Sequence, residues 1–243
     1  VEVVKLLLGR GADVNIQRTD DRSTALMWAS QNGHSEIVKM LLENGTEINA
    51  QTEDRATALM LASQNGHCGI VKMLIEMGAD VNVHRISNNV TALWLAAQNG
   101  HIDIIKMLVE KGADVNVQRT SDCATALMWA AQNGNLELAG FLISNGADIN
   151  VKNATNGGTS LWIAAQSGHA DIVRLLIEKG GDVNLKSTTD GATALMWAAQ
   201  NGHTDVVRTL VENGADIDVK NSANGATALW LAAQNGHADI VRI

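Results

Sequence analysis

Six histidines recur at nearly constant spacing, and they are the first residues of this sequence that could do chemistry, as ligands of a metal ion. They are His34, His67, His101, His169, His203 and His237. A zinc site needs ligands that converge on one ion at about 2 Å, whereas the spacing places each histidine at the start of an equivalent helix in a different repeat. The pattern therefore predicts a structural role at a turn between helices, with no metal site and no cofactor.

The other candidates for chemistry are cysteines and glycine-rich segments. Cys68 and Cys123 stand at non-equivalent points of the chain and have no distinctive histidine partner. The glycine-rich segments at 156–158 and 179–181 lack the lysine and the strand–loop–helix context of a phosphate loop. We therefore expect no catalytic residue and no enzymatic activity. Two cysteines without a disulfide framework favour a reducing, cytoplasmic (intracellular) location.

The elements that position these residues all copy one stretch, Thr193 to Asn213, which reads TALMWAAQNGHTDVVRTLVEN. Its opening threonine recurs at intervals of 33 and then five times 34 residues, at Thr24, Thr57, Thr91, Thr125, Thr159, Thr193 and Thr227. Each copy reads as a threonine N-cap, a short helix stopped by glycine, and a second, amphipathic helix. A fixed period of this length predicts an array of stacked repeats.

The segments NGATALWLAAQNGHADIV (224–241) and KMLVEKGADVN (106–116) resemble the ankyrin repeat, and the resemblance extends over the whole chain. It implies an all-α solenoid of helix-turn-helix units with short β-hairpin fingers, usually a binder of other proteins. We expect one array over residues 1–243, with partial repeats at 1–18 and 222–243 and full repeats at 19–51, 52–85, 86–119, 120–153, 154–187 and 188–221. Because the chain starts and stops inside second helices, we expect it to be a segment of a longer array, or to stack end to end with another copy.

Two departures from the family pattern lead to predictions. The family's histidine after leucine is replaced by Met27, Met60, Trp94, Met128, Trp162, Met196 and Trp230. Apolar packing is expected to replace the hydrogen bond of the missing imidazole to the cap threonine. The fourth repeat has Asn135 in place of histidine and Gly140 inside its second helix, so we expect it to open most easily.

The tryptophans fall into two sets. Trp28, Trp129 and Trp197 lie four residues after the cap threonine, and Trp94, Trp162 and Trp230 lie three after it. Adjacent helical positions differ by about 100° in direction, so the two sets should face different neighbours. One interpretation is packing between repeats, and the other is an aromatic lining of a concave groove that anchors a partner.

The segments between repeats, here called fingers, vary most. They are residues 19–23, 52–56, 86–90, 120–124, 154–158, 188–192 and 222–226. The end of the first helix is nearly constant as Gln-Asn, so specificity should lie in the fingers. We predict that a protein partner is bound by fingers and groove, through Asp20, Asp21, Arg22, Glu53, Asp54, Arg55, Asn88, Asn89, Trp28, Trp129 and Trp197.

Charge and hydropathy exclude other partners. The formal net charge of −8 argues against nucleic acid, whose binding depends on Lys and Arg. No apolar run approaches 18 residues, so no membrane insertion is expected. Three functions stay open at this point: a protein–protein interaction scaffold, a structural spacer array, and a segment that delivers substrate within a larger enzyme.

Overall fold

The computed structural model describes residues 1–243 and contains fifteen helices and no strand. The first helices of the repeats are α2 (Ala25–Gln31), α4 (Ala58–Gln64), α6 (Ala92–Gln98), α8 (Ala126–Gln132), α10 (Ser160–Ser167), α12 (Ala194–Gln200) and α14 (Ala228–Gln234). The second helices are α1 (Glu2–Gly9), α3 (Ser35–Glu43), α5 (Cys68–Glu76), α7 (Ile102–Glu110), α9 (Leu136–Ser144), α11 (Ala170–Glu178), α13 (Thr204–Glu212) and α15 (Ala238–Val241). The predicted all-α helix-turn-helix array is confirmed.

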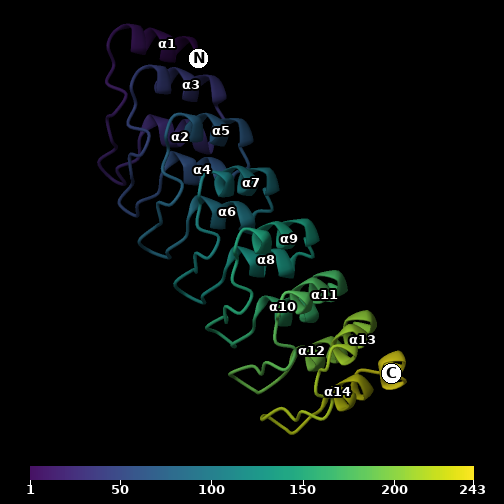
Figure 1. The fold of residues 1–243 in the computed structure, drawn as a ribbon. Coiled ribbons are helices and arrows are strands. Elements are labelled where there is room, and N and C mark those ends of the chain that lie inside the picture. The colour runs from purple at the N-terminus through teal and green to yellow at the C-terminus, as the bar shows by residue number, and fades with distance from the viewer. The chain divides into compact units, whose positions relative to one another are not determined.

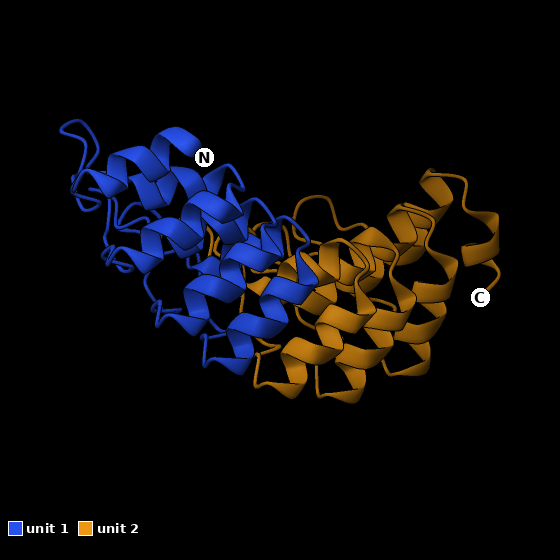
Figure 2. Ribbon diagram, turned by 90° about the horizontal axis from the view of Figure 1, so that it is seen from above, with its two compact units in different colours: residues 1–120 blue, residues 121–243 orange.

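The chain divides into two compact units, a first unit of residues 1–120 and a second unit of residues 121–243 (Figure 2). In the first unit, α2, α4 and α6 pack on one another, and α3, α5 and α7 form a second layer (Figure 1). In the second unit, α8, α10, α12 and α14 form one layer, and α9, α11, α13 and α15 form the other. Within each unit, the first helices lie between the second helices and the fingers.

Threonine begins each first helix as the sequence predicts. In six repeats its hydroxyl accepts a hydrogen bond from the backbone N–H three residues on, at 3.3 to 3.4 Å. Thr159 alone makes no such bond. A threonine cap of this kind stabilises a helix by about 1 kcal/mol, which matters for helices of only two turns.

The residues that replace the family's histidine form part of the core. Met27, Met60 and Met196 are each 1% exposed, and Trp94 and Trp162 are also buried. Trp230, in the last repeat, is 48% exposed. Apolar packing at this position is therefore confirmed for the repeats that have a neighbour on both sides.

The histidines that start the second helices join neighbouring repeats. In five repeats Nε2 lies 2.9 to 3.2 Å from the backbone oxygen of a glutamine in the last turn of the first helix of the preceding repeat. A carbonyl oxygen only accepts, so Nε2 carries the proton and donates it. The preceding turn needs glycine, because a Cβ on Gly33 would lie 2.8 Å from Cε1 of His67. The predicted structural role of the histidines is confirmed.

The fourth repeat differs at the same turn. Asn135 accepts a hydrogen bond from the backbone N–H of Leu138 at 2.9 Å and so caps α9, whereas the histidines that begin the other second helices make no side-chain cap bond. None of the helices in the structure has the length and hydrophobicity needed to cross a membrane.

Candidate functional site

The fingers are tight turns whose tips adopt a left-handed backbone conformation. The first finger closes through a hydrogen bond from the backbone N–H of Arg18 to the oxygen of Ser23, at 2.9 Å. The left-handed residue has a side chain in the first four fingers, as Arg22, Arg55, Asn89 and Cys123, with φ between 57° and 61°. In the last three fingers it is glycine, at Gly157, Gly191 and Gly225. The hairpins are too short to form strands, and only Lys186 and Thr193 form an isolated antiparallel bridge.

Backbone hydrogen bonds link each finger to the next within a unit. In the first unit the N–H of Glu53 donates to the oxygen of Asp21 at 3.2 Å, and that of Ile86 donates to Asp54 at 3.2 Å. In the second unit the same bond joins Ala154 to Asp122 and Ser222 to Asp190. We call these bonds the finger ladder. Because of them, the finger tips are held in place before any partner arrives.

The carboxylates and amides of the fingers also hold the turns. Asp21 Oδ1 accepts from the backbone N–H of Ser23 at 2.8 Å. The hydroxyl and the backbone N–H of Ser23 both stabilise the ionised form and lower the pKa of the Asp21 carboxyl below its ordinary value. Asp54 turns to the third finger instead, where its two oxygens accept from the N–H and the hydroxyl of Ser87 at 2.7 and 2.8 Å.

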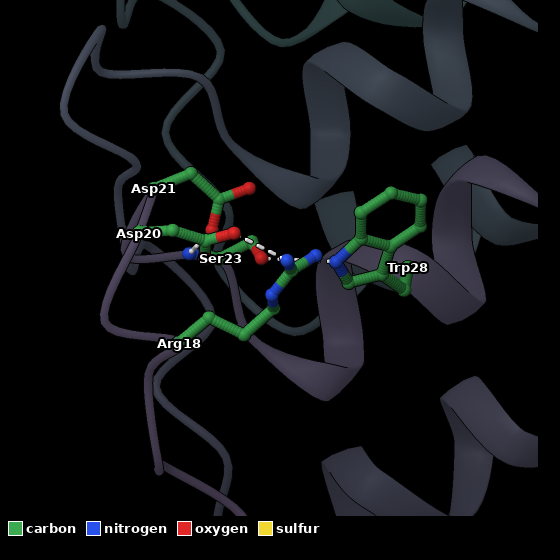
Figure 3. Close-up of polar contacts among 5 residues, drawn as sticks. All are labelled: Arg18, Asp20, Asp21, Ser23 and Trp28. Carbon is green, nitrogen blue, oxygen red and sulfur yellow. Dashed lines mark hydrogen bonds and ion pairs between the residues drawn. The ribbon is translucent and has the colours of Figure 1, made fainter.

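Trp28 is the exposed aromatic residue of this region (Figure 3). Its Nε1 donates to Ser23 Oγ at 2.9 Å, and the guanidinium carbon of Arg18 lies 5.8 Å from the ring centroid. Arg18 is in turn paired with Asp20. The indole is nevertheless 44% exposed. Because Ser23 and the Arg18–Asp20 pair fix its surroundings, the ring is oriented without being buried.

The other predicted site residues divide between the two units. Arg22 and Arg55 donate from Nε to glutamines at the bases of their own fingers, at 3.1 and 3.2 Å. Asn89 donates to the backbone oxygen of Gln118 at 3.0 Å, and Asn88 accepts from the backbone of its own finger. The structure thus brings the predicted residues of the first three fingers to one side of the first unit, together with Trp28.

Trp129 and Trp197 lie in the second unit and are half-buried. Trp197 makes an edge-to-face contact with Trp162, with ring centroids 5.3 Å apart. In the first unit, the guanidinium carbon of Arg119 lies 5.1 Å from the ring centroid of the buried Trp94. Trp94 and Trp162, three residues after the cap, are thus buried, whereas Trp129 and Trp197, four after it, are half-buried. The two positions do not have separate neighbours throughout, because Trp162 and Trp197 contact each other.

Sequence reasoning missed three residues of this surface. Arg18 stacks on Trp28, Ser23 orients it, and Ile86 is 68% exposed in the third finger. Ser23 and Ile86 could have been found from the sequence, because each departs from the other repeats. The residue before the cap threonine is serine only in the first repeat, and the residue that opens the finger is a large apolar one only at Ile86.

Two clefts have mostly polar linings, one along second helices and one beside the third finger. A cleft of about 680 Å³ lies along α11 and α13, where Arg174 donates to Asp171 at 2.9 Å. Another, of about 470 Å³, is lined by His84, Asn89 and Asp114. The structure contains no group of three or more His, Cys, Asp or Glu residues that could hold a metal ion.

Comparison with known proteins identifies the repeats. A sequence model for ankyrin repeats in three copies matches residues 1–85, 83–153 and 127–221, and a model for a single ankyrin repeat matches residues 224–243. The crystal structure of the human ASB11 ankyrin repeat domain is similar, with 27% sequence identity and a TM-score of 0.76, covering 90% of this chain and 97% of that one. Among curated proteins, none matches the chain.

Proposed function

The chain belongs to the ankyrin repeat family, and on that premise we propose that it binds a protein partner through the first three fingers. Ankyrin repeats are generally protein–protein interaction modules and are typically non-catalytic. The proposed contact residues are Asp20, Asp21, Arg22, Glu53, Asp54, Arg55, Asn88 and Asn89, with Trp28 beside them.

The observation that carries the proposal is the left-handed conformation of side-chain-bearing residues in these fingers. A residue other than glycine costs on the order of 1 kcal/mol there, and Gly157, Gly191 and Gly225 avoid that cost in the same chain. Arg22 and Arg55 keep long polar side chains at the strained position. Strain that persists where a cheaper residue is available is typical of functional positions.

Rigidity of the surface also supports the proposal. Binding costs roughly 0.5 to 1.5 kcal/mol for each flexible side chain that must be ordered. The finger ladder and the contacts around Trp28 order much of this surface in advance. A half-exposed tryptophan in a fixed orientation is the type of residue that contributes most to binding energy. Trp129 and Trp197 are proposed as separate partner contacts on the second unit.

The test is affinity capture from an extract of the source cells, quantified by mass spectrometry. The native chain is compared with Arg22→Gly/Arg55→Gly, and the control is Cys123→Gly in the fourth finger. All three changes relieve left-handed strain, so neither variant should unfold. We expect a protein that the native chain and the control retain and the double variant loses.

Two other results would contradict the proposal in different ways. Equal capture by all three proteins would place the contact away from the first two fingers. If the native chain specifically captures no protein, the array acts as a spacer or acts only within a larger protein.

A further inference from the structure

Two large apolar side chains are exposed on the finger side of the first unit. Trp28 is 44% exposed beside the first finger, and Ile86 is 68% exposed in the third. The second finger lies between them, because the ladder bonds join Glu53 to the first finger and Asp54 to the third. Of the two, tryptophan is the residue type that most often anchors a protein partner.

The polar strip between these residues is formed by Asp21, Glu53 and Asp54. The first two fingers contain four carboxylates, of which Asp20 pairs with Arg18, and two arginines, Arg22 and Arg55. No lysine or arginine nitrogen lies within 4 Å of the carboxylates of Asp21, Glu53 and Asp54. The arginines of the same fingers direct Nε to glutamines at the finger bases instead. Hydrogen bonds to Ser23 keep the Asp21 carboxyl ionised, with a lowered pKa. With a net charge of −8 on the chain, this strip is complementary to a cationic partner.

The stacking of the repeats sets a length scale for that partner. Helices in contact, such as α2, α4 and α6, pack about 8 to 10 Å apart, and the ladder keeps the fingers at the same period. A polyproline II chain rises about 3.1 Å per residue with three residues per turn. Every third side chain therefore faces the same way at a period of about 9 Å. A β-strand alternates its side chains and does not match this period.

We propose that the partner segment is an extended, basic peptide in which two lysines or arginines three residues apart are followed, three residues later, by an apolar residue. The first cation pairs with Asp21 and its aliphatic stem packs on Trp28. The second cation pairs with Glu53 and Asp54, and the apolar side chain covers Ile86. This inference rests on the proposed function and adds the chemistry of the partner.

The probe is the synthetic peptide Lys-Pro-Pro-Lys-Pro-Pro-Leu, titrated into the whole chain by isothermal titration calorimetry. A second peptide with three prolines between the side chains breaks the register, and a third with glutamate in place of lysine reverses the charge. Binding is also followed through the indole N–H resonance of Trp28, assigned by its loss in Trp28→Phe. We expect only the first peptide to bind and to shift this resonance.

Matched variants of the protein distinguish binding of the peptide to the polar strip from attraction to the negative charge of the whole chain. Asp21→Asn/Asp54→Asn removes two charges from the first unit, and Asp122→Asn/Asp190→Asn removes two from the same finger position in the second. Asparagine occupies this position in Asn88, Asn156 and Asn224, so the turns are preserved. We expect the first pair to weaken binding by about three- to tenfold and the control pair to change it by less than about twofold.

Three results would overturn the inference. If both pairs of substitutions weaken peptide binding equally, the peptide is attracted unspecifically to an acidic protein. If the peptide with three prolines between its side chains binds as tightly as the first peptide, the spacing of three residues plays no part in binding. No binding of the first peptide, with the finger-dependent capture intact, would show that the chain binds a protein of other chemistry. If the capture also fails, the proposed function itself is wrong.

Discussion

Nε1 of Trp28 donates a hydrogen bond to Ser23 Oγ at 2.9 Å, whereas Nε1 of Trp197, at the same position of the sixth repeat, is buried without an acceptor. The residue equivalent to Ser23 is Ala192. The sixth repeat therefore lacks the hydroxyl that accepts from the indole in the first repeat. This difference leads directly to a test.

Ala192→Ser should stabilise the protein, because the new hydroxyl can accept from Trp197 Nε1 as Ser23 accepts from Trp28. A satisfied buried hydrogen bond contributes about 1 kcal/mol to the free energy of unfolding, measured here by urea denaturation. Ala56→Ser is the control, since the second repeat has leucine at the tryptophan position and offers no indole. If both serines destabilise the protein equally, Ala192 does not lie within reach of the indole.

Ser63→Ala should also be stabilising. The hydroxyl of Ser63 is fully buried in α4 and has no hydrogen-bond partner, and the third repeat has Ala97 at this position. Removing an unpaired buried hydroxyl should increase the free energy of unfolding by about 1 kcal/mol. Chemical denaturation of the two proteins measures the difference, and a loss of stability would mean that the hydroxyl has a partner in solution.

Gly140→Ala should stabilise the fourth repeat in particular. A Cβ at this position would meet nothing within 4 Å, and alanine is favoured over glycine in a helix by about 1 kcal/mol. Hydrogen exchange should show α9 as the least protected second helix between α3 and α13 in the native protein, and the substitution should raise its protection. The cap that Asn135 provides works against this opening, so protection of native α9 equal to that of α11 would contradict the prediction.

Gly134→Ala is the matched control in the same repeat. Gly134 has a φ of 70°, and a Cβ there would lie 2.5 Å from Cε1 of His169. Here the added methyl should destabilise the protein, because it combines backbone strain with a clash against the histidine that joins the next repeat. A neutral effect would mean that His169 is not held against this turn.

The ionisation of Asp21 should depend on Ser23. In an NMR titration of the side-chain carboxyl carbon, the pKa of Asp21 should lie below its ordinary value of 3.8 and should rise in Ser23→Ala. Because the folded state lowers this pKa, its contribution to stability is complete above pH 3.8 and is lost as the pH falls through the folded value. An unchanged pKa in the variant would mean that the Ser23 hydroxyl does not act on the carboxylate.

The sequence by itself determined the repeat, the threonine caps, the all-α array and the apolar packing of Met27 and Met60. It could do so because helical periodicity, capping and glycine stops are local properties, and the same pattern recurs in every repeat. It also predicted that tryptophans three and four residues after the cap differ in surroundings, since adjacent helical positions point about 100° apart.

Only the tertiary structure decided which polar groups meet those tryptophans and which finger residues are exposed together. The indole N–H of Trp28 finds an acceptor in Ser23, whereas that of Trp197 is buried without one. The strip formed by Asp21, Glu53 and Asp54 exists because backbone bonds join fingers about 33 residues apart in the chain. Such contacts depend on the distances between repeats, and the spacing of residues along one repeat contains no information about them.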